Sequence, residues 1–203
     1  MFRKLTLKLA TFVIGVSLLV GTTTSAWAQD LQNGVRAFLS GDFGTALREF
    51  RLLAEQGNVD AQFYLGTMYE SGQGVIQDYK EAVEWYRLAA EQGDKSAQLA
   101  LGNMYDKGQG VIQDSKEAVK WFRLAAEQGS AFAQGSLGAM YGNGQGVIQD
   151  DVMAHMWFNI AASKGNLTAA KNRDIVAKLM TQAQIAKAQQ LARECLAKNY
   201  KGC

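Results

Sequence analysis

The stretch Gly-Gln-Gly-Val-Ile-Gln-Asp decides the fold of this chain, because it occurs three times without change. Its copies run over residues 72–78, 108–114 and 144–150, so each copy begins 36 residues after the previous one. A fixed period of this length is the signature of an array of stacked structural repeats. The sequence therefore predicts a binding scaffold built from repeats, and it leaves open what is bound.

Three full repeats extend around these copies, over residues 61–96, 97–132 and 133–168. The first two agree at 25 of 36 positions and the last two at 19. Helix-breaking glycines stand in mid-repeat and near the end of each unit, which predicts two helices per repeat. Apolar residues between Tyr79 and Ala90 recur at steps of three and four, and the resulting face needs a neighbouring helix pair to cover it.

The flanking segments read as further helix pairs. We expect a capping pair over residues 29–60, in which Asp42 caps the second helix, and capping helices with a tail over residues 169–203. Thr181 with Gln184 forms a predicted capping box. Asp78 with Glu81, and Asp114 with Glu117, are predicted to do the same. The predicted fold class is all-α: an α/α superhelical solenoid of about five helix pairs with three full 36-residue repeats.

Residues 1–28 have the layout of a secretory signal peptide. A basic start is followed by the apolar run Leu9–Val20, and small residues precede a predicted cleavage site after Ala28. An uncleaved membrane anchor is the alternative, but the run is shorter than the ~20 residues that span a bilayer. We therefore expect a periplasmic or secreted protein, without stable membrane insertion once the signal is cleaved.

Charge makes nucleic acid an improbable partner. Removing residues 1–28 takes away three basic residues and leaves 18 Lys and Arg against 19 Asp and Glu. Without a basic stripe there is no electrostatic basis for binding nucleic acid or anionic lipid.

Cys195 and Cys203 are the only cysteines. In a continuous helix their separation of roughly 12 Å would exceed the ~5.5 Å between the Cα atoms of a disulfide. A bond requires the tail to turn back, which Gly202 permits. A terminal disulfide is the first prediction, and free thiols or an intermolecular bond are the alternatives.

Each repeat carries three motifs in order: Ala-Gln-x-x-Leu-Gly-x-Met-Tyr, Gly-Gln-Gly-Val-x-Gln-Asp and Ala-x-x-Trp-(Tyr/Phe)-x-x-Ala-Ala-x-x-Gly. In these letters the chain resembles the Sel1-like repeat family, relatives of the tetratricopeptide repeats with a longer loop. The resemblance covers nearly all of residues 30–180. It implies an α/α solenoid and, for exported members, a non-enzymatic role in protein binding, signalling complexes or envelope assembly.

Two departures from the family pattern matter. Ile76, Ile112 and Ile148 stand where the family loop often has Pro, and we expect them to pack against the next repeat. A cysteine-rich exported branch of the family is described as penicillin-binding with weak β-lactamase activity, which is the alternative function. Residues 29–180 contain no Cys, and the motif places no base near Ser71 or Ser136.

Other candidate chemistry has simpler interpretations. The Gly-Gln-Gly loops follow helices and lead to Asp, unlike phosphate-binding loops. His155, the only histidine, lies in a column that otherwise holds Val83 and Val119, so we expect a packed residue with one hydrogen bond. No cofactor and no metal site are predicted. The aromatic columns are expected to fill inter-helix slots, with each hydroxyl or indole N–H on a polar partner: Tyr69, Tyr105, Tyr141, Trp85, Trp121 and Trp157.

The functional prediction concerns positions that differ between repeats in the first helix of each unit. By helical spacing they form a stripe, which by analogy with the tetratricopeptide fold faces a groove that binds a protein or peptide. Unconstrained solvent exposure is the alternative. The predicted stripe comprises Phe63, Thr67, Glu70, Ser71, Leu99, Asn103, Asp106, Lys107, Gly135, Ala139, Gly142 and Asn143.

Overall fold

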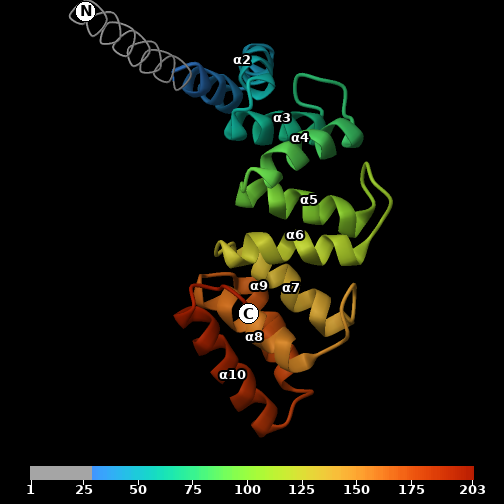
Figure 1. Cartoon of the computed structure of the whole chain (residues 1–203), viewed down its shortest axis with the longest axis vertical. Coiled ribbons are helices and arrows are strands. Elements are labelled where there is room, and N and C mark those ends of the chain that lie inside the picture. Colours follow the sequence, from blue (N-terminus) through green and yellow to red (C-terminus); the bar gives the residue numbers. More distant parts are fainter. Residues whose placement is uncertain (1–28) are drawn as a thin grey trace, which may run out of the picture. The chain divides into compact units, whose positions relative to one another are not determined.

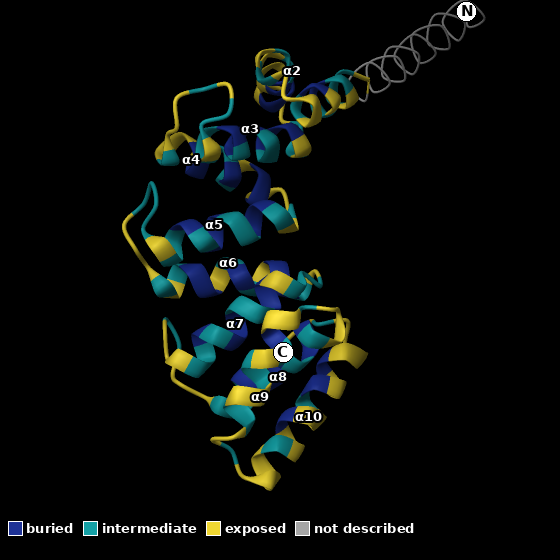
Figure 2. Ribbon diagram, turned by 180° about the vertical axis from the view of Figure 1, so that it is seen from behind, coloured by how far each residue is buried: buried dark blue, intermediate teal, exposed yellow. Residues whose placement is uncertain are grey.

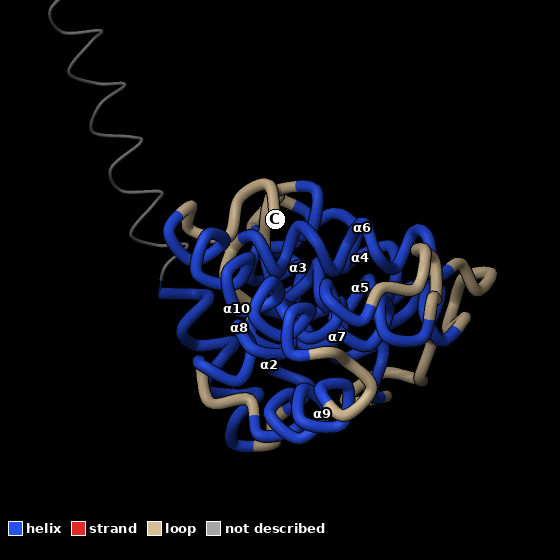
Figure 3. Tube along the Cα trace, turned by 90° about the horizontal axis from the view of Figure 1, so that it is seen from below, coloured by secondary structure: helices blue, strands red, loops and turns tan. Residues whose placement is uncertain are grey.

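The structure, a computed structural model, describes residues 29–203 and contains helices and loops without strands over that range (Figures 1 and 3). The predicted signal peptide lies outside the described residues. Residues 29–40 are helical. The helices that follow are α2 (Phe43–Glu55), α3 (Val59–Ser71), α4 (Tyr79–Glu91), α5 (Lys95–Lys107), α6 (Ser115–Glu127), α7 (Ala131–Asn143), α8 (Asp151–Ser163), α9 (Leu167–Ala177) and α10 (Gln182–Ala197). The all-α prediction is confirmed.

The described residues divide after Leu65 into two compact units. The first unit is held by an aromatic cluster, in which the rings of Phe50 and Tyr64 stack with centroids 4.8 Å apart and Phe38 contacts both. Asp42 caps α2 by accepting a hydrogen bond from the Thr45 N–H at 3.1 Å. That bond lowers the pKa of the Asp42 carboxyl.

In the second unit, residues 66–203, consecutive helices pack in pairs. Contacts join α4 to α5, α5 to α6, α6 to α7 and α7 to α8, and α8 also contacts α9 and α10. The second helix of each pair buries one face, coloured dark blue in Figure 2; in α4 this face is formed by Ala82, Val83, Tyr86, Ala89 and Ala90. The core of this unit therefore runs between successive helices.

A glycine packed against an aromatic ring joins the two helices of each repeat. Gly66 faces Tyr86, Gly102 faces Phe122, and Gly138 faces Phe158. A Cβ atom added at any of these glycines would lie 2.6 Å from its ring, closer than real Cβ atoms come to another heavy atom. Helix backbone and ring are thus in direct contact, and no larger residue fits at this column.

The Gly-Gln-Gly-Val-Ile-Gln-Asp loop is held at both ends, as its second copy shows. Gly108 ends α5 in the left-handed conformation, with φ of 68°, which glycine adopts without strain. The side chain of Gln113 donates a hydrogen bond to the Asp106 carbonyl at 2.7 Å, and the N–H of Asp114 donates to the Tyr105 carbonyl at 3.0 Å.

Of the three predicted capping boxes, one forms completely and two form by half. Asp114 caps α6 by accepting hydrogen bonds from the N–H groups of Lys116 and Glu117. The reciprocal half of the predicted capping box is wrong, because the Asp114 N–H donates to α5 instead; Asp78 behaves in the same way. The predicted box of Thr181 and Gln184 is confirmed.

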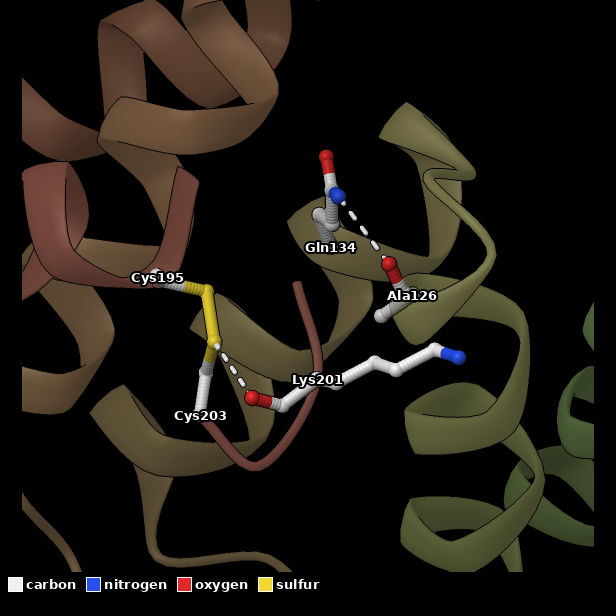
Figure 4. Close-up of a disulfide and its surroundings, with 5 residues drawn as sticks. All are labelled: Ala126, Gln134, Cys195, Lys201 and Cys203. Carbon is white, nitrogen blue, oxygen red and sulfur yellow. Dashed lines mark hydrogen bonds between the residues drawn. A yellow bond between two sulfur atoms is a disulfide. The ribbon is translucent and has the colours of Figure 1, made fainter. Parts of the chain in front are cut away.

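The second glycine of the loop joins neighbouring repeats. A Cβ on Gly110 would overlap the carbonyl of Tyr79 in the preceding repeat, and a Cβ on Gly146 would overlap that of Ser115. Buried glutamines add a second link: Gln98 donates to the Ala90 carbonyl, and Gln134 to the Ala126 carbonyl, both at 3.1 Å (Figure 4). The unchanged residues of the loop and of Ala-Gln therefore serve stacking.

Two sequence expectations about apolar residues are wrong. Ile76, Ile112 and Ile148 do not pack against the next repeat, since each is about nine-tenths exposed at its loop. The indole N–H groups of Trp121 and Trp157 are buried without a hydrogen-bond partner. The tyrosine column behaves as expected in the second and third repeats, where Tyr105 and Tyr141 accept hydrogen bonds from Arg87 and Arg123.

The C-terminal tail turns back and forms the disulfide between Cys195 and Cys203, with Cα atoms 5.5 Å apart (Figure 4). The turn uses positive φ angles at Asn199, Tyr200 and Gly202. It places the ring of Tyr200 4.1 Å from the ammonium of Lys164.

We predict that Gly102→Ala destabilises the protein. Alanine normally stabilises a helix interior by about 1 kcal/mol over glycine. Here its Cβ would meet the Phe122 ring at 2.6 Å, so overpacking should outweigh propensity and lower the free energy of unfolding by about 1–2 kcal/mol. Urea unfolding of residues 29–203 measures the change.

Gly142→Ala is the matched control, since its Cβ would make an ordinary contact of 3.6 Å with Ala154. It should raise the free energy of unfolding by up to about 1 kcal/mol. Equal effects of the two substitutions would contradict the proposed role of the glycine column.

Candidate functional site

A groove runs along α7, between α7 and α9, over the ring of Phe158. It consists of two adjoining hollows of about 310 Å³ and 290 Å³, which share Ala139, Phe158 and Asn172. Phe158 is 4% exposed and forms the floor. The first hollow is otherwise lined by Phe132, Gly135, Ser136, Asn166, Thr168 and Ala169. The second is otherwise lined by Gly142, Asn143, Gln149, Asp151, Ile175, Val176 and Leu179.

The groove exists because two side chains that cover the ring in the first repeat are missing in the third. In the first repeat the Tyr86 hydroxyl donates a hydrogen bond to Glu70 at 2.6 Å and contacts the Thr67 hydroxyl at 3.3 Å. Burial and the Glu70 carboxylate raise the pKa of Tyr86. In the third repeat Ala139 and Gly142 occupy the positions of Thr67 and Glu70, and neither has a side chain that could form a hydrogen bond over the ring.

Polar groups in the groove are mainly amides and hydroxyls. α7 contains no charged residue, and Asp151 is the charged residue among those that line the hollows. Asn166 is engaged, accepting from the Ala169 N–H and donating to the Ala131 carbonyl. Asn172 lies at the junction of the hollows, half-buried, and its amide has no hydrogen bond within the described part of the chain.

The sequence matches the Sel1 repeat over residues 59–94, 95–130 and 131–166, which is more than half of its length. The chain belongs to the Sel1 repeat family. Each matched segment starts at or beside the first residue of α3, α5 or α7, two residues before the unit expected from the internal alignment. Proteins built from Sel1 repeats are in general scaffolds for protein–protein interaction.

Solved structures of Sel1 repeat proteins are similar to this one. A Sel1 repeat protein from Oxalobacter formigenes is 28% identical, with a TM-score of 0.70 over 81% of this chain and 75% of its own. A protective antigen of uropathogenic Escherichia coli with the same repeat fold is 34% identical, with a TM-score of 0.59 over 77% of this chain. This chain spans 42% of the length of that antigen. Among curated proteins, none matches significantly.

The predicted stripe divides between the repeats of this Sel1 chain. In the first repeat Thr67 and Glu70 contact Tyr86, and the hydroxyl of Ser71 donates to the Thr67 carbonyl at 2.7 Å. The ring of Phe63 contacts that of Tyr64, within the first unit. In this repeat the stripe residues thus make contacts inside the chain.

In the second repeat Leu99 packs against the core, Asn103 and Asp106 are half-buried, and Lys107 is exposed. The stripe residues that line the groove come from the third repeat, namely Gly135, Ala139, Gly142 and Asn143.

Sequence reasoning missed the opposite wall and the floor of the groove. Asn172, Ile175 and Leu179 lie on or just after α9, beyond residue 168, where the internal alignment ends. In the sequence Phe158 is one aromatic residue of the Trp-(Tyr/Phe) motif, and nothing in that motif indicates that it lines a groove. The sequence held one signal, a correlated change between positions. Where Phe replaces Tyr86 in the later repeats, the residues at the positions of Thr67 and Glu70 change as well.

His155 is buried, at 3% exposure, on the face of α8 that its valine column predicts. Its Nδ1 atom is buried without a hydrogen-bond partner, so the expected single bond is not made at that nitrogen. Burial lowers the pKa of His155, nearby Arg173 lowers it further, and Asp174 opposes the shift. His155 does not line the groove.

We predict that His155 makes stability depend on pH. Because its folded pKa is lowered, the unfolded chain binds the proton more readily, and stability falls as pH drops below the unfolded pKa. The loss attributable to His155 should reach at most about 1.4 kcal/mol between about pH 7.5 and 5.5. Urea unfolding at a series of pH values measures it.

His155→Val is the control, because Val83 and Val119 occupy the same column. The variant should lose this part of the pH dependence while keeping the contribution of the carboxyl groups. Identical pH profiles for the two proteins would show that His155 contributes nothing.

The serines considered for an enzymatic function lack a catalytic neighbourhood. Ser136 lines the first hollow, whose lining contains no titratable group that could act as a base. The hydroxyl of Ser71 donates its hydrogen bond to the Thr67 carbonyl in its own helix. Residues 29–203 hold no cluster of His, Cys, Asp and Glu suited to a metal ion. Among the same residues, no helix has the length and apolar character needed to cross a bilayer.

Proposed function

We propose that this Sel1 chain is an exported, non-catalytic adaptor that binds a segment of a protein partner in the groove between α7 and α9. The observation that carries the proposal is the pair of hollows over the ring of Phe158. Among the three matched repeats, the third has lost the side chains that cover this position in the first, and the vacated space opens to the surface.

The shape and lining of the groove suit a peptide segment. Hollows of about 300 Å³ each exceed the ~150 Å³ cavity that holds a benzene ring, so each has room for one large apolar side chain. Because the two hollows adjoin along α7, they favour a segment with two apolar side chains about one helical turn apart. Phe132 and Leu179, which are 72% and 73% exposed, extend the apolar surface at the rim.

Asn172 supplies the polar contact that orients such a segment. Its amide can donate to a carbonyl and accept from an N–H group, so it can pair with the main chain of a partner irrespective of sequence. A half-buried amide without an intramolecular partner gains more from such pairing than an exposed one. We therefore assign main-chain recognition to Asn172 and side-chain recognition to the hollows.

Export is part of the proposal. The basic, apolar and small-residue order of residues 1–28 supports a cleaved signal peptide, and the disulfide between Cys195 and Cys203 suits an oxidising compartment. In a periplasmic or secreted setting, a groove of this kind would hold a partner in an envelope assembly or signalling complex. The lack of a base beside Ser136 supports a binding role rather than a β-lactamase-like one.

Selection from a displayed library of random peptides of about 12 residues, long enough for three helical turns, tests the groove. The bait is the disulfide-bonded protein, residues 29–203. The matched variant is Ala139→Thr with Gly142→Gln, which restores the sizes of Thr67 and Glu70 over the ring without adding charge. We expect enriched sequences with two apolar anchors, and binding of the synthesised peptides weakened at least about tenfold by the variant.

Asn103→Ala, on the corresponding turn of α5 and outside both hollows, should leave peptide binding unchanged. Failure to enrich any sequence, or equal enrichment on the filled variant, would remove the groove as the binding site. Circular dichroism and urea unfolding confirm that the variants fold.

A further inference from the structure

We propose that the segment bound in the groove is acidic, with carboxylates that lie along the outer face of α9. The inference rests on the proposed peptide-binding function and names the chemical class of the partner. It is carried by the distribution of charge around the groove.

The net charge of the chain is near neutral, but basic and acidic residues are unevenly distributed along it. From Lys164 to Cys203 there are eight Lys or Arg and two Asp or Glu, a net charge of +6, whereas residues 29–163 hold ten basic and seventeen acidic residues, a net charge of −7. Because α9 belongs to the basic segment, one wall of the groove carries positive charge, and the α7 wall is uncharged.

Two lysines, Lys171 in α9 and Lys178 at its C-cap, stand beside the apolar rim. Lys171 precedes Ile175 by four residues and Lys178 follows it by three, so helical spacing puts all three on one face. All three are exposed, and Ile175 lines the second hollow. A segment seated in that hollow would thus have two ammonium groups within reach of the side chains that point away from it.

Neither lysine is neutralised within the described part of the chain. The ion pair on α9 is between Arg173 and Asp174, at 2.8 Å, and no carboxylate lies within ion-pair distance of Lys171 or Lys178. Cations that stand unpaired at the edge of an apolar groove favour a partner that brings negative charge.

Asp151 determines where the carboxylates of the partner can lie. It lines the second hollow itself, as do Asn143 and Leu179. A carboxylate inside the hollow would meet this like charge, whereas one on the α9 face would meet Lys171 or Lys178. The expected segment therefore puts apolar side chains into the hollows and acidic ones on the α9 side.

The peptides selected on the wild-type protein test this inference. We expect enriched sequences to carry more Asp and Glu than the starting library. In fluorescence anisotropy, replacing the acidic residues of a selected peptide by Gln or Asn should weaken binding about 3- to 10-fold at low salt, as for two exposed ion pairs. The difference should disappear at high salt, where such pairs are screened.

Lys171→Glu with Lys178→Glu should abolish the preference for the acidic peptide and leave the Gln peptide bound. Lys187→Glu with Lys201→Glu makes the same charge change on exposed residues of α10 and the tail, outside both hollows, and should keep the preference. Equal binding of acidic and Gln peptides, or equal effects of the two variants, would overturn the acidic partner while leaving the peptide groove intact.

Loss of all peptide binding in Ala139→Thr with Gly142→Gln, without any acidic bias, would support the groove alone. Absence of peptide binding to the wild-type protein would remove both proposals. Vesicles that contain phosphatidylserine address the other source of negative charge. Binding to them that depends on Lys171 and Lys178, with no acidic bias in the peptides, would assign the basic rim to a lipid surface and contradict the inference.

Discussion

Direct contact between a glycine and an aromatic ring is the constraint on which each repeat depends. Gly66, Gly102 and Gly138 let the first helix approach Tyr86, Phe122 and Phe158 of the second until backbone and ring touch. Because the ring occupies the place of a side chain, the two helices are set at one separation. The loop that joins them must then close over a fixed distance, which explains why its glycines, Gln and Asp are the same in all three copies.

The same contact prepares the groove. A ring that packs against a glycine is covered on one side by backbone, and its other edge depends on the residue directly after that glycine and on the residue four positions after it. In the first repeat Thr67 and Glu70 supply that cover through the Tyr86 hydroxyl. In the third repeat Ala139 and Gly142 do not, so Phe158 becomes the floor of two hollows while its contact with Gly138 is kept. Small residues thus create a binding surface on a helix that the packing already holds in place.

Much of the fold could be predicted from the sequence because a repeat displays its constraints several times. The period, the helix pairs and the aspartate caps follow from local residues. The groove could not be predicted in the same way. Helical spacing put Thr67 and Gly142 in comparable columns of one stripe. Yet Thr67 contacts Tyr86 and Gly142 lines a hollow together with Phe158, a difference that depends on residues 16 to 19 positions later. The exposed loop isoleucines also escaped prediction, because the Gly and Asp contacts close the loop without them.

The most direct test of this account compares two rings in one protein. Phe122 and Phe158 occupy the same column, each against a glycine. Phe158 lines both hollows of the groove, and Phe122 lines neither of them. Side-chain NMR of the wild-type protein, titrated with a selected peptide, reports on both rings at once. The account predicts that the ring signals of Phe158 shift and show contacts to an apolar side chain of the peptide, while those of Phe122 stay in place. Peptide binding that leaves Phe158 unmoved, or shifts both rings alike, would contradict it.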